Sequence, residues 1–119
     1  MEKRELGRFG EERAARYLRL RGYRILETNY ACRIGEIDLI AKKGGYIVFV
    51  EVKLRKSADF AAAREFVTAA KQQRIRSTAA LWLSQNETAL QPRFDVVEIY
   101  APQGAGGRIT INHIENAFE

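Results

Sequence analysis

Residues 35–55 predict a β-hairpin, and this stretch constrains the fold more than any other part of the chain. Residues 35–43 and 46–54 are rich in Ile, Leu, Val, Phe and Tyr, and two glycines separate them. Glycine reaches the positive φ that a two-residue hairpin turn requires, so Gly44 and Gly45 form the expected turn. The turn joins the two strands and fixes which residues lie opposite each other across the hairpin.

That register brings charged residues together. Counting outward from the turn places Asp38 opposite Glu51 and Glu36 opposite Lys53, and all four on one face because side chains alternate along a strand. Two carboxylates at about 5 Å repel by on the order of 3 kcal/mol, which a divalent cation such as Mg²⁺ would offset. Lys53 would then lie where its ammonium orients a water molecule or stabilises charge developing at phosphorus. The pattern therefore predicts a metal site.

An ordinary polar sheet face is the alternative, with Lys53 and Arg55 neutralising the acids in surface ion pairs. Against it, residues 46–52 are apolar on both faces, which indicates a covered central strand. The residues alone leave both interpretations open.

A longer motif surrounds these acids. An Asp followed by a hydrophobic strand with Glu-x-Lys resembles the PD-(D/E)xK nuclease signature. The strings GEID at 35–38 and FVEVK at 49–53, followed by Arg55, resemble the bacterial YraN-like family, which is similar to archaeal Holliday junction resolvases. The resemblance covers almost the whole chain and implies a restriction-endonuclease-like fold.

The remaining elements fit that expectation. With 119 residues and 46% hydrophobic content, we expect one domain over residues 1–119, and the resemblance implies that this domain is nuclease-like. A helix between the third and fourth strands predicts that these two strands are parallel. The predicted fold class is α/β, a three-layer α-β-β-β-α-β core with a mixed central sheet plus an edge strand. Its expected elements are a helix over 2–21, strands over 23–30, 35–43 and 46–54, a helix from Thr68 to about Gln85, and strands over 93–101 and 108–113.

Composition indicates which kind of molecule the protein binds and in which compartment it is expected. A net charge of +5 favours a polyanion, most commonly nucleic acid. The single cysteine, Cys32, excludes a disulfide framework or zinc cluster and favours a reducing cytoplasm. The chain has no signal-peptide core and no apolar run long enough to span a bilayer, so a cytoplasmic protein without membrane partners is expected.

Glu11 lies at the edge of the apolar arc of the first helix, so its carboxylate should point toward the sheet. The plain interpretation is an edge residue paired with an arginine. The resemblance implies instead that a glutamate on this helix completes the acidic cluster. The arc itself comprises Leu6, Gly10, Ala14, Tyr17 and Leu18.

The resemblance also implies roles for the cluster. Glu11, Asp38 and Glu51 would hold one or two Mg²⁺ or Mn²⁺ ions, with the backbone carbonyl of Val52 as a further ligand. Lys53 would position the attacking water.

Several basic residues suit phosphate contacts. Arg55, Lys56 and Arg64 lie in or beside the loop after the third strand, where a solvated connector is the alternative. Lys71 begins the apolar stripe of the second helix. It either extends along the core edge toward solvent or, as the family's lysine at this point implies, reaches the cleft and contacts phosphate.

Two features near the C-terminus have plainer interpretations. Arg93 and Asp95 match an RFD string of the family, and we expect them to form a structural ion pair. His113, the only histidine, is expected to be solvated on an edge strand and is assigned no role.

The function expected from the resemblance is a metal-dependent endonuclease acting on structured or branched DNA in recombination or repair. Resolvase-like proteins cut paired strands as dimers, so a homodimer is implied by analogy. The alternative is a nucleic-acid-binding module of a recombination or repair complex that performs no chemistry.

Overall fold

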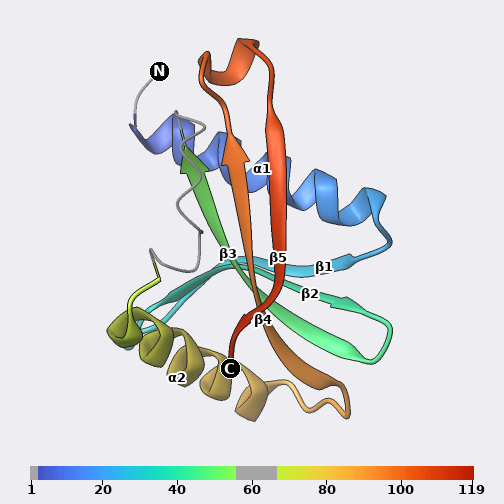
Figure 1. Ribbon diagram of the computed structural model, residues 1–119. Coiled ribbons are helices and arrows are strands. Elements are labelled where there is room, and N and C mark those ends of the chain that lie inside the picture. The colour runs from blue at the N-terminus through green and yellow to red at the C-terminus, as the bar shows by residue number, and fades with distance from the viewer. Residues whose placement is uncertain (1–2, 56–66) are drawn as a thin grey trace.

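The computed structural model describes residues 3–55 and 67–119 of the chain. A mixed five-stranded sheet and two helices make up an α/β fold (Figure 1). In chain order the elements are α1 (Lys3–Leu20), β1 (Arg24–Ala31), β2 (Glu36–Lys43), β3 (Tyr46–Arg55), α2 (Ala69–Gln85), β4 (Gln91–Tyr100), the short 3-10 helix η2 (Gly104–Gly106) and β5 (Thr110–Phe118).

The strands lie in sequence order across the sheet. Strands β1, β2 and β3 form an antiparallel meander, β4 is parallel to β3, and β5 is antiparallel to β4. This confirms the predicted order of elements and the predicted parallel pair. Strand β5 continues to Phe118, five residues beyond the predicted end.

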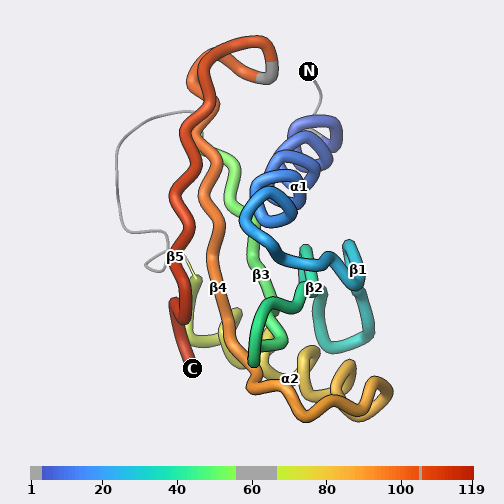
Figure 2. The backbone as a smooth tube through the Cα atoms, turned by 90° about the vertical axis from the view of Figure 1, so that its right-hand side faces the viewer, coloured from blue at the N-terminus to red at the C-terminus, as the bar shows by residue number. Residues whose placement is uncertain are grey.

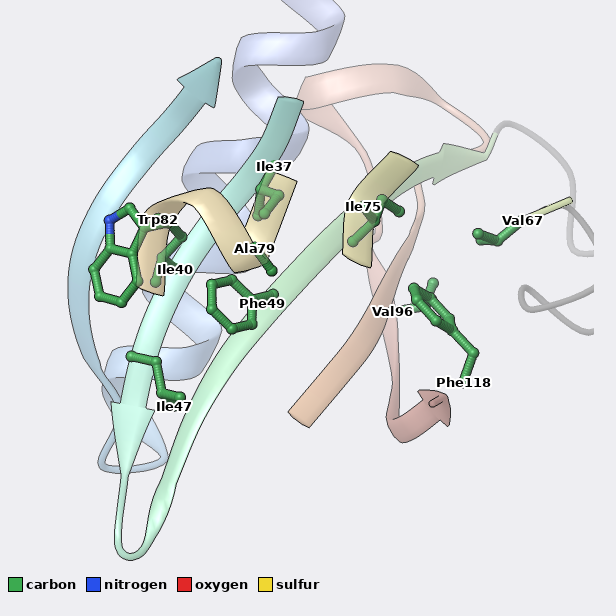
Figure 3. Close-up of a cluster of buried hydrophobic side chains, with 10 residues drawn as sticks. All are labelled: Ile37, Ile40, Ile47, Phe49, Val67, Ile75, Ala79, Trp82, Val96 and Phe118. Atoms are coloured by element: carbon green, nitrogen blue, oxygen red, sulfur yellow. The ribbon is translucent and has the colours of Figure 1, made fainter. Parts of the chain in front are cut away.

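Strand β3 separates two layers of core, because its side chains alternate between them. Ile47 and Phe49 pack with α2, whereas Val48 and Val50 pack with α1. The two helices therefore cover opposite faces of the sheet (Figure 2). Figure 3 shows the α2 side, where Ile75, Ala79 and Trp82 lie over residues of β2 and β3.

Local chemistry explains the boundaries of these elements. Gly44 has a φ of 57°, as the hairpin turn requires, and Lys43 pairs with Tyr46 as predicted. The hydroxyl of Thr68 accepts a hydrogen bond from the backbone N–H of Lys71 at 3.1 Å, which caps α2. Gly22, with a φ of 90°, follows α1 and turns the chain into β1.

Most residues of the predicted buried faces are buried, whereas Leu6, Tyr17 and Lys71 are half-buried. Gly10, Ala14 and Leu18 of α1 are buried. On α2 the buried residues are Ile75, Thr78, Ala79 and Trp82. Neither of the helices that the structure describes is long and apolar enough to cross a membrane.

Candidate nuclease-like site

The candidate site lies where β2 separates from β3. The predicted register is confirmed as far as Leu39, which pairs with Val50. The ladder ends there, one step before Asp38 and Glu51, so these two do not form the predicted ladder pair. Beyond this point β3 pairs with β4 alone.

The Asp38 carboxylate closes the gap that this separation leaves. Its Oδ2 accepts a hydrogen bond from the backbone N–H of Val52 at 2.8 Å. A backbone donor at a strand edge needs a partner when it is shielded from water, and here a side chain replaces the missing strand. A backbone hydrogen bond from β3 thus holds the Asp38 carboxylate in place at the site.

The premise of strict alternation does not hold at this end of β2. Ile37 and Ile40 both pack in the α2-side cluster, whereas Leu39 packs on the α1 side. Residues three apart cannot share a face in a regular strand. The prediction that four charged residues share one face therefore fails for β2.

Glu51 is the most enclosed acid of the predicted set, with 8% of its surface exposed. Its Oε1 atom lies 2.6 Å from the ammonium of Lys71 and 3.4 Å from that of Lys53. Lys71 thus reaches the acidic site from the first turn of α2. The Lys53–Glu51 pair is the ion pair that the sequence left open as an alternative, with a second cation added.

The environment of Asp38 favours its neutral form. Loss of surrounding water and the negative charge of Glu51 raise the pKa of Asp38 to about 7. The Val52 N–H acts in the opposite direction, but it does not outweigh these effects. Glu11 and Glu36 add further repulsion. Negative charge therefore dominates the surroundings of Asp38, although two lysines form ion pairs with Glu51.

The two lysines differ in proton affinity. Burial and the nearby ammonium of Lys71 lower the pKa of Lys53. Burial also acts against charge on Lys71, but its hydrogen bond to Glu51 outweighs this and raises its pKa. Lys53 is therefore the amine of this pair that more readily becomes neutral and accepts a proton.

Glu11 belongs to α1, which covers the face of the sheet opposite to α2. It is half-buried on α1 and lines a hollow that also includes Arg19 and Leu39. Glu51 and Lys71 line a different hollow, of about 200 Å³, with Glu36 and Arg74. The structure brings Asp38, Glu51, Lys53 and Lys71 together, while Glu11 acts on Asp38 through its charge from the α1 side.

The donor set has the chemistry that a hard divalent cation requires. Asp38 and Glu51 supply carboxylate oxygens. Asp38 also accepts a hydrogen bond from the backbone N–H of Val52, the residue whose carbonyl was predicted as a further ligand. Within residues 3–55 and 67–119, no three His, Cys, Asp or Glu side chains are grouped to hold a metal ion. Lys71 and Lys53 provide the positive charge at Glu51 instead.

The predicted nucleic-acid contacts fall in three places. Arg55 is half-buried, and its Nε lies 3.9 Å from Glu98 of β4. Lys71 contacts Glu51, as above. Lys56 and Arg64 lie outside the described residues.

Sequence reasoning missed Glu98. Only 1% of this residue is exposed, it lies beside Lys53 in the parallel ladder, and its Oε1 accepts a hydrogen bond from Asn112 at 3.0 Å. The signal was a single acid interrupting the apolar run VVEIY in a predicted central strand. Glu98 extends the charged network of the site from β3 to β5.

A second buried network lies on the α1 face of β4. The predicted ion pair is confirmed, with Arg93 donating to both carboxylate oxygens of Asp95 at 2.9 and 2.8 Å. The prediction of a solvated His113 is wrong: only 6% of its side chain is exposed, and its Nε2 lies 2.7 Å from Asp95. Tyr17 and Tyr23 pack against the imidazole ring, which explains its burial.

Comparison with known proteins assigns this chain to a family. The model of the Uncharacterised protein family UPF0102 matches residues 10–99. A UPF0102 protein of Caldanaerobacter subterraneus subsp. tengcongensis is 46% identical over 119 residues, covering 99% of this chain and 98% of that protein. A UPF0102 protein of Symbiobacterium thermophilum is 47% identical over 116 residues, covering 97% of each. The chain therefore belongs to the YraN-like family, UPF0102.

Proposed function

We propose that this protein is a metal-dependent endonuclease with a restriction-endonuclease-like core that acts on structured or branched DNA. One observation carries the proposal. Where β2 separates from β3, the acids Asp38 and Glu51 lie with the amines of Lys53 and Lys71. Phosphodiester hydrolysis requires such a combination of oxygen ligands for a cation and a group that handles the proton of water.

The carboxylates of Asp38 and Glu51, the Val52 carbonyl and Glu11 would hold Mg²⁺ or Mn²⁺. The bound ion would supply Lewis-acid stabilisation of the negative charge on the phosphodiester. The Val52 N–H holds Asp38 in place, which limits its rotation before substrate binds. Glu51 positions both lysines through a single carboxylate oxygen.

Lys53 performs the proton transfer in this proposal. Burial and the ammonium of Lys71 lower the pKa of Lys53, so Lys53 would lose its own proton and accept one from water more readily than Lys71. The water oxygen forms a bond to phosphorus, the bond from phosphorus to the leaving sugar oxygen breaks, and solvent protonates that oxygen. Lys71, which stays charged, donates to a non-bridging phosphate oxygen.

The test is cleavage of a labelled panel of DNA substrates, comprising a four-way junction, a flap, a single strand and a duplex, with Mg²⁺ or Mn²⁺. Purified wild-type protein is compared with Asp38→Ala and with Glu12→Gln, which removes an exposed acid of α1. We expect metal-dependent cutting of the junction or flap by the wild type and Glu12→Gln, and none by Asp38→Ala. Absence of cutting by the wild type on every substrate contradicts the proposal.

One observation favours the non-catalytic binding module as second candidate. Glu51 already has two ammonium partners, so its charge is balanced without a metal. If the protein is such a binding module, DNA binding should depend on salt and be unchanged in Asp38→Ala, and the wild type should cut none of the substrates.

A further inference from the structure

Residues 13–26 contain five arginines and no acidic residue. They form the C-terminal half of α1, the turn that follows it and the start of β1, in the lighter blue that follows the N-terminal part of α1 in Figure 1. We call this set the α1 arginine face. It comprises Arg13, Arg16, Arg19, Arg21 and Arg24.

The α1 arginine face is charged and accessible. Four of its members are exposed, and Arg13 is half-buried. In the part of the chain that the structure describes, none of the five forms an ion pair with an acid. The guanidinium of Arg21 lies 4.6 Å from the centre of the Tyr17 ring. Other cations, such as Arg93 and Lys71, are neutralised by carboxylates within the fold.

This concentration of charge has an energetic cost. Like charges three or four positions apart on a helix destabilise it by about 0.2–0.5 kcal/mol per pair. The helix dipole favours a cation in the last turn, which accounts for Arg19, and Glu12 lies four positions before Arg16, but neither effect accounts for Arg13. An anionic partner would offset the remaining repulsion.

The α1 arginine face also adjoins the candidate site. Arg19 lines the same hollow as Glu11 and Leu39, the neighbour of Asp38. Eight residues of helix separate Glu11 from Arg19, which is about 12 Å along the axis. On the other flank of α1, Arg13 and Arg16 line a second hollow with Leu20. The face thus runs from the hollow beside Glu11, whose charge acts on Asp38, over the outer surface of the helix.

The side chains of the face suit a phosphate backbone. Binding to single strands commonly uses exposed aromatic rings on which bases stack. Among the described residues the exposed large apolar side chains are Leu20, Ile34 and Tyr46, and only Leu20 lies within this face. Exposed guanidinium groups without a stacking platform fit the phosphates of a double helix.

We infer that the α1 arginine face binds the backbone of a duplex arm that extends from the candidate site. This inference deepens the proposed function and rests on it for the position of the arm. It adds a second contact region that reads no bases. The residues predicted from the sequence for this purpose were others, namely Arg55, Lys56, Arg64 and Lys71.

The experiment measures binding of a labelled 20-base-pair duplex by fluorescence anisotropy, in EDTA, over a range of salt concentrations. The triple variant Arg16→Ala, Arg19→Ala, Arg24→Ala removes three exposed members of the face. A charge-matched control removes three exposed arginines elsewhere, Arg4, Arg33 and Arg108. Thermal melting of both variants verifies that they are folded.

We expect the face variant to bind at least about tenfold more weakly at low salt, and its salt slope to fall by about 3, because each phosphate contact contributes about one unit. The control should stay within about twofold of wild type. Equal losses in both variants, or no duplex binding by the wild type, overturn the inference. The inference is also overturned if the wild type binds anionic phospholipid vesicles, or a single strand of equal length, more tightly than it binds the duplex.

Because EDTA excludes metal-dependent cutting, the two proposals fail separately. A wild type that binds through the face but never cuts contradicts only the endonuclease. A wild type that cuts the junction while both triple variants bind equally contradicts only the role of the face.

Discussion

Asp38 lies in an environment that differs strongly from that of an ordinary surface acid. Its pKa is raised to about 7, against 3.8 for an unperturbed aspartate. Between these pH values the folded protein binds more protons than the unfolded chain, so the free energy of unfolding falls as pH rises. Burial of this acid therefore destabilises the metal-free protein most above pH 7.

We expect Asp38→Asn to stabilise the metal-free protein increasingly as pH rises from 4 to 7. The amide oxygen of Asn still accepts the Val52 N–H bond but carries no charge. The gain is at most about 4 kcal/mol, since each unit of pKa difference corresponds to about 1.4 kcal/mol. Urea unfolding in EDTA at several pH values measures it. An equal difference at pH 4 and pH 8 contradicts the expectation.

Lys53 and Lys71 contact the same oxygen of Glu51 but have different expected roles. Lys53→Met should lower the single-turnover cleavage rate by about 10²–10⁴-fold, the usual contribution of a general base. Its affinity for the junction should change little. Lys71→Met should weaken junction binding as well. Identical effects of the two variants on rate and on binding would exclude this division of roles.

At the level of elements, α2 supplies a cation to the site through its first turn. Thr68 caps this turn by accepting the N–H of Lys71, whose side chain then reaches Glu51. Thr68→Ala should lower the free energy of unfolding by about 1 kcal/mol, as loss of a helix cap does. Thr68→Ser, which keeps the hydroxyl, is the control and should lose only a few tenths. Equal losses in Ala and Ser variants would show that the hydroxyl does not matter.

The hairpin shows what the sequence could and could not predict at this scale. The two-glycine turn set the register correctly from Lys43–Tyr46 to Leu39–Val50. The end of the ladder was not predictable, because it depends on the Asp38 carboxylate taking the Val52 N–H from the backbone. Periodicity describes a regular strand, and the site occupies the place where β2 stops being regular.

Across the whole molecule, Asp95 connects elements far apart in sequence. It is fully buried on β4 and accepts hydrogen bonds from Arg93 and from the backbone N–H of Asn116 on β5. His113 adds a third contact from β5. Burial acts against its charge, but these contacts outweigh burial and lower the pKa of Asp95. Its charged form therefore stabilises the fold, an effect lost only as pH falls below about 4.

We expect Asp95→Asn to lower the free energy of unfolding by about 3–5 kcal/mol at pH 7, because it removes the fully buried charge that pairs with the half-buried guanidinium of Arg93. The difference from wild type should shrink as pH falls below about 4. Urea unfolding is the measurement, with Glu115→Gln as a control that removes an exposed acid of the same neighbourhood. A loss below 1 kcal/mol at pH 7 contradicts a stabilising role for this network.

At this largest scale the order of elements was predictable and the burial of His113 was not. Apolar runs, the Gly44–Gly45 turn and the cap at Thr68 are local signals, and each appears in the structure where expected. The environment of His113 depends on contacts from Tyr17, Tyr23 and Asp95, which only the assembled sheet brings together. Glu11 likewise acts on Asp38 only through its charge, from a helix whose placement local patterns do not specify.

The central claim is that Asp38 and Glu51 form a cation-binding centre, and its most direct test is calorimetric titration of Mn²⁺ into the full chain at pH 7. We expect wild type and Glu12→Gln to bind the ion and to release protons, since Asp38, whose pKa is raised to about 7, is partly protonated and must lose its proton to become a ligand. Asp38→Asn and Glu51→Gln should show little or no binding. Equal binding by all four proteins, or none by the wild type, contradicts the claim.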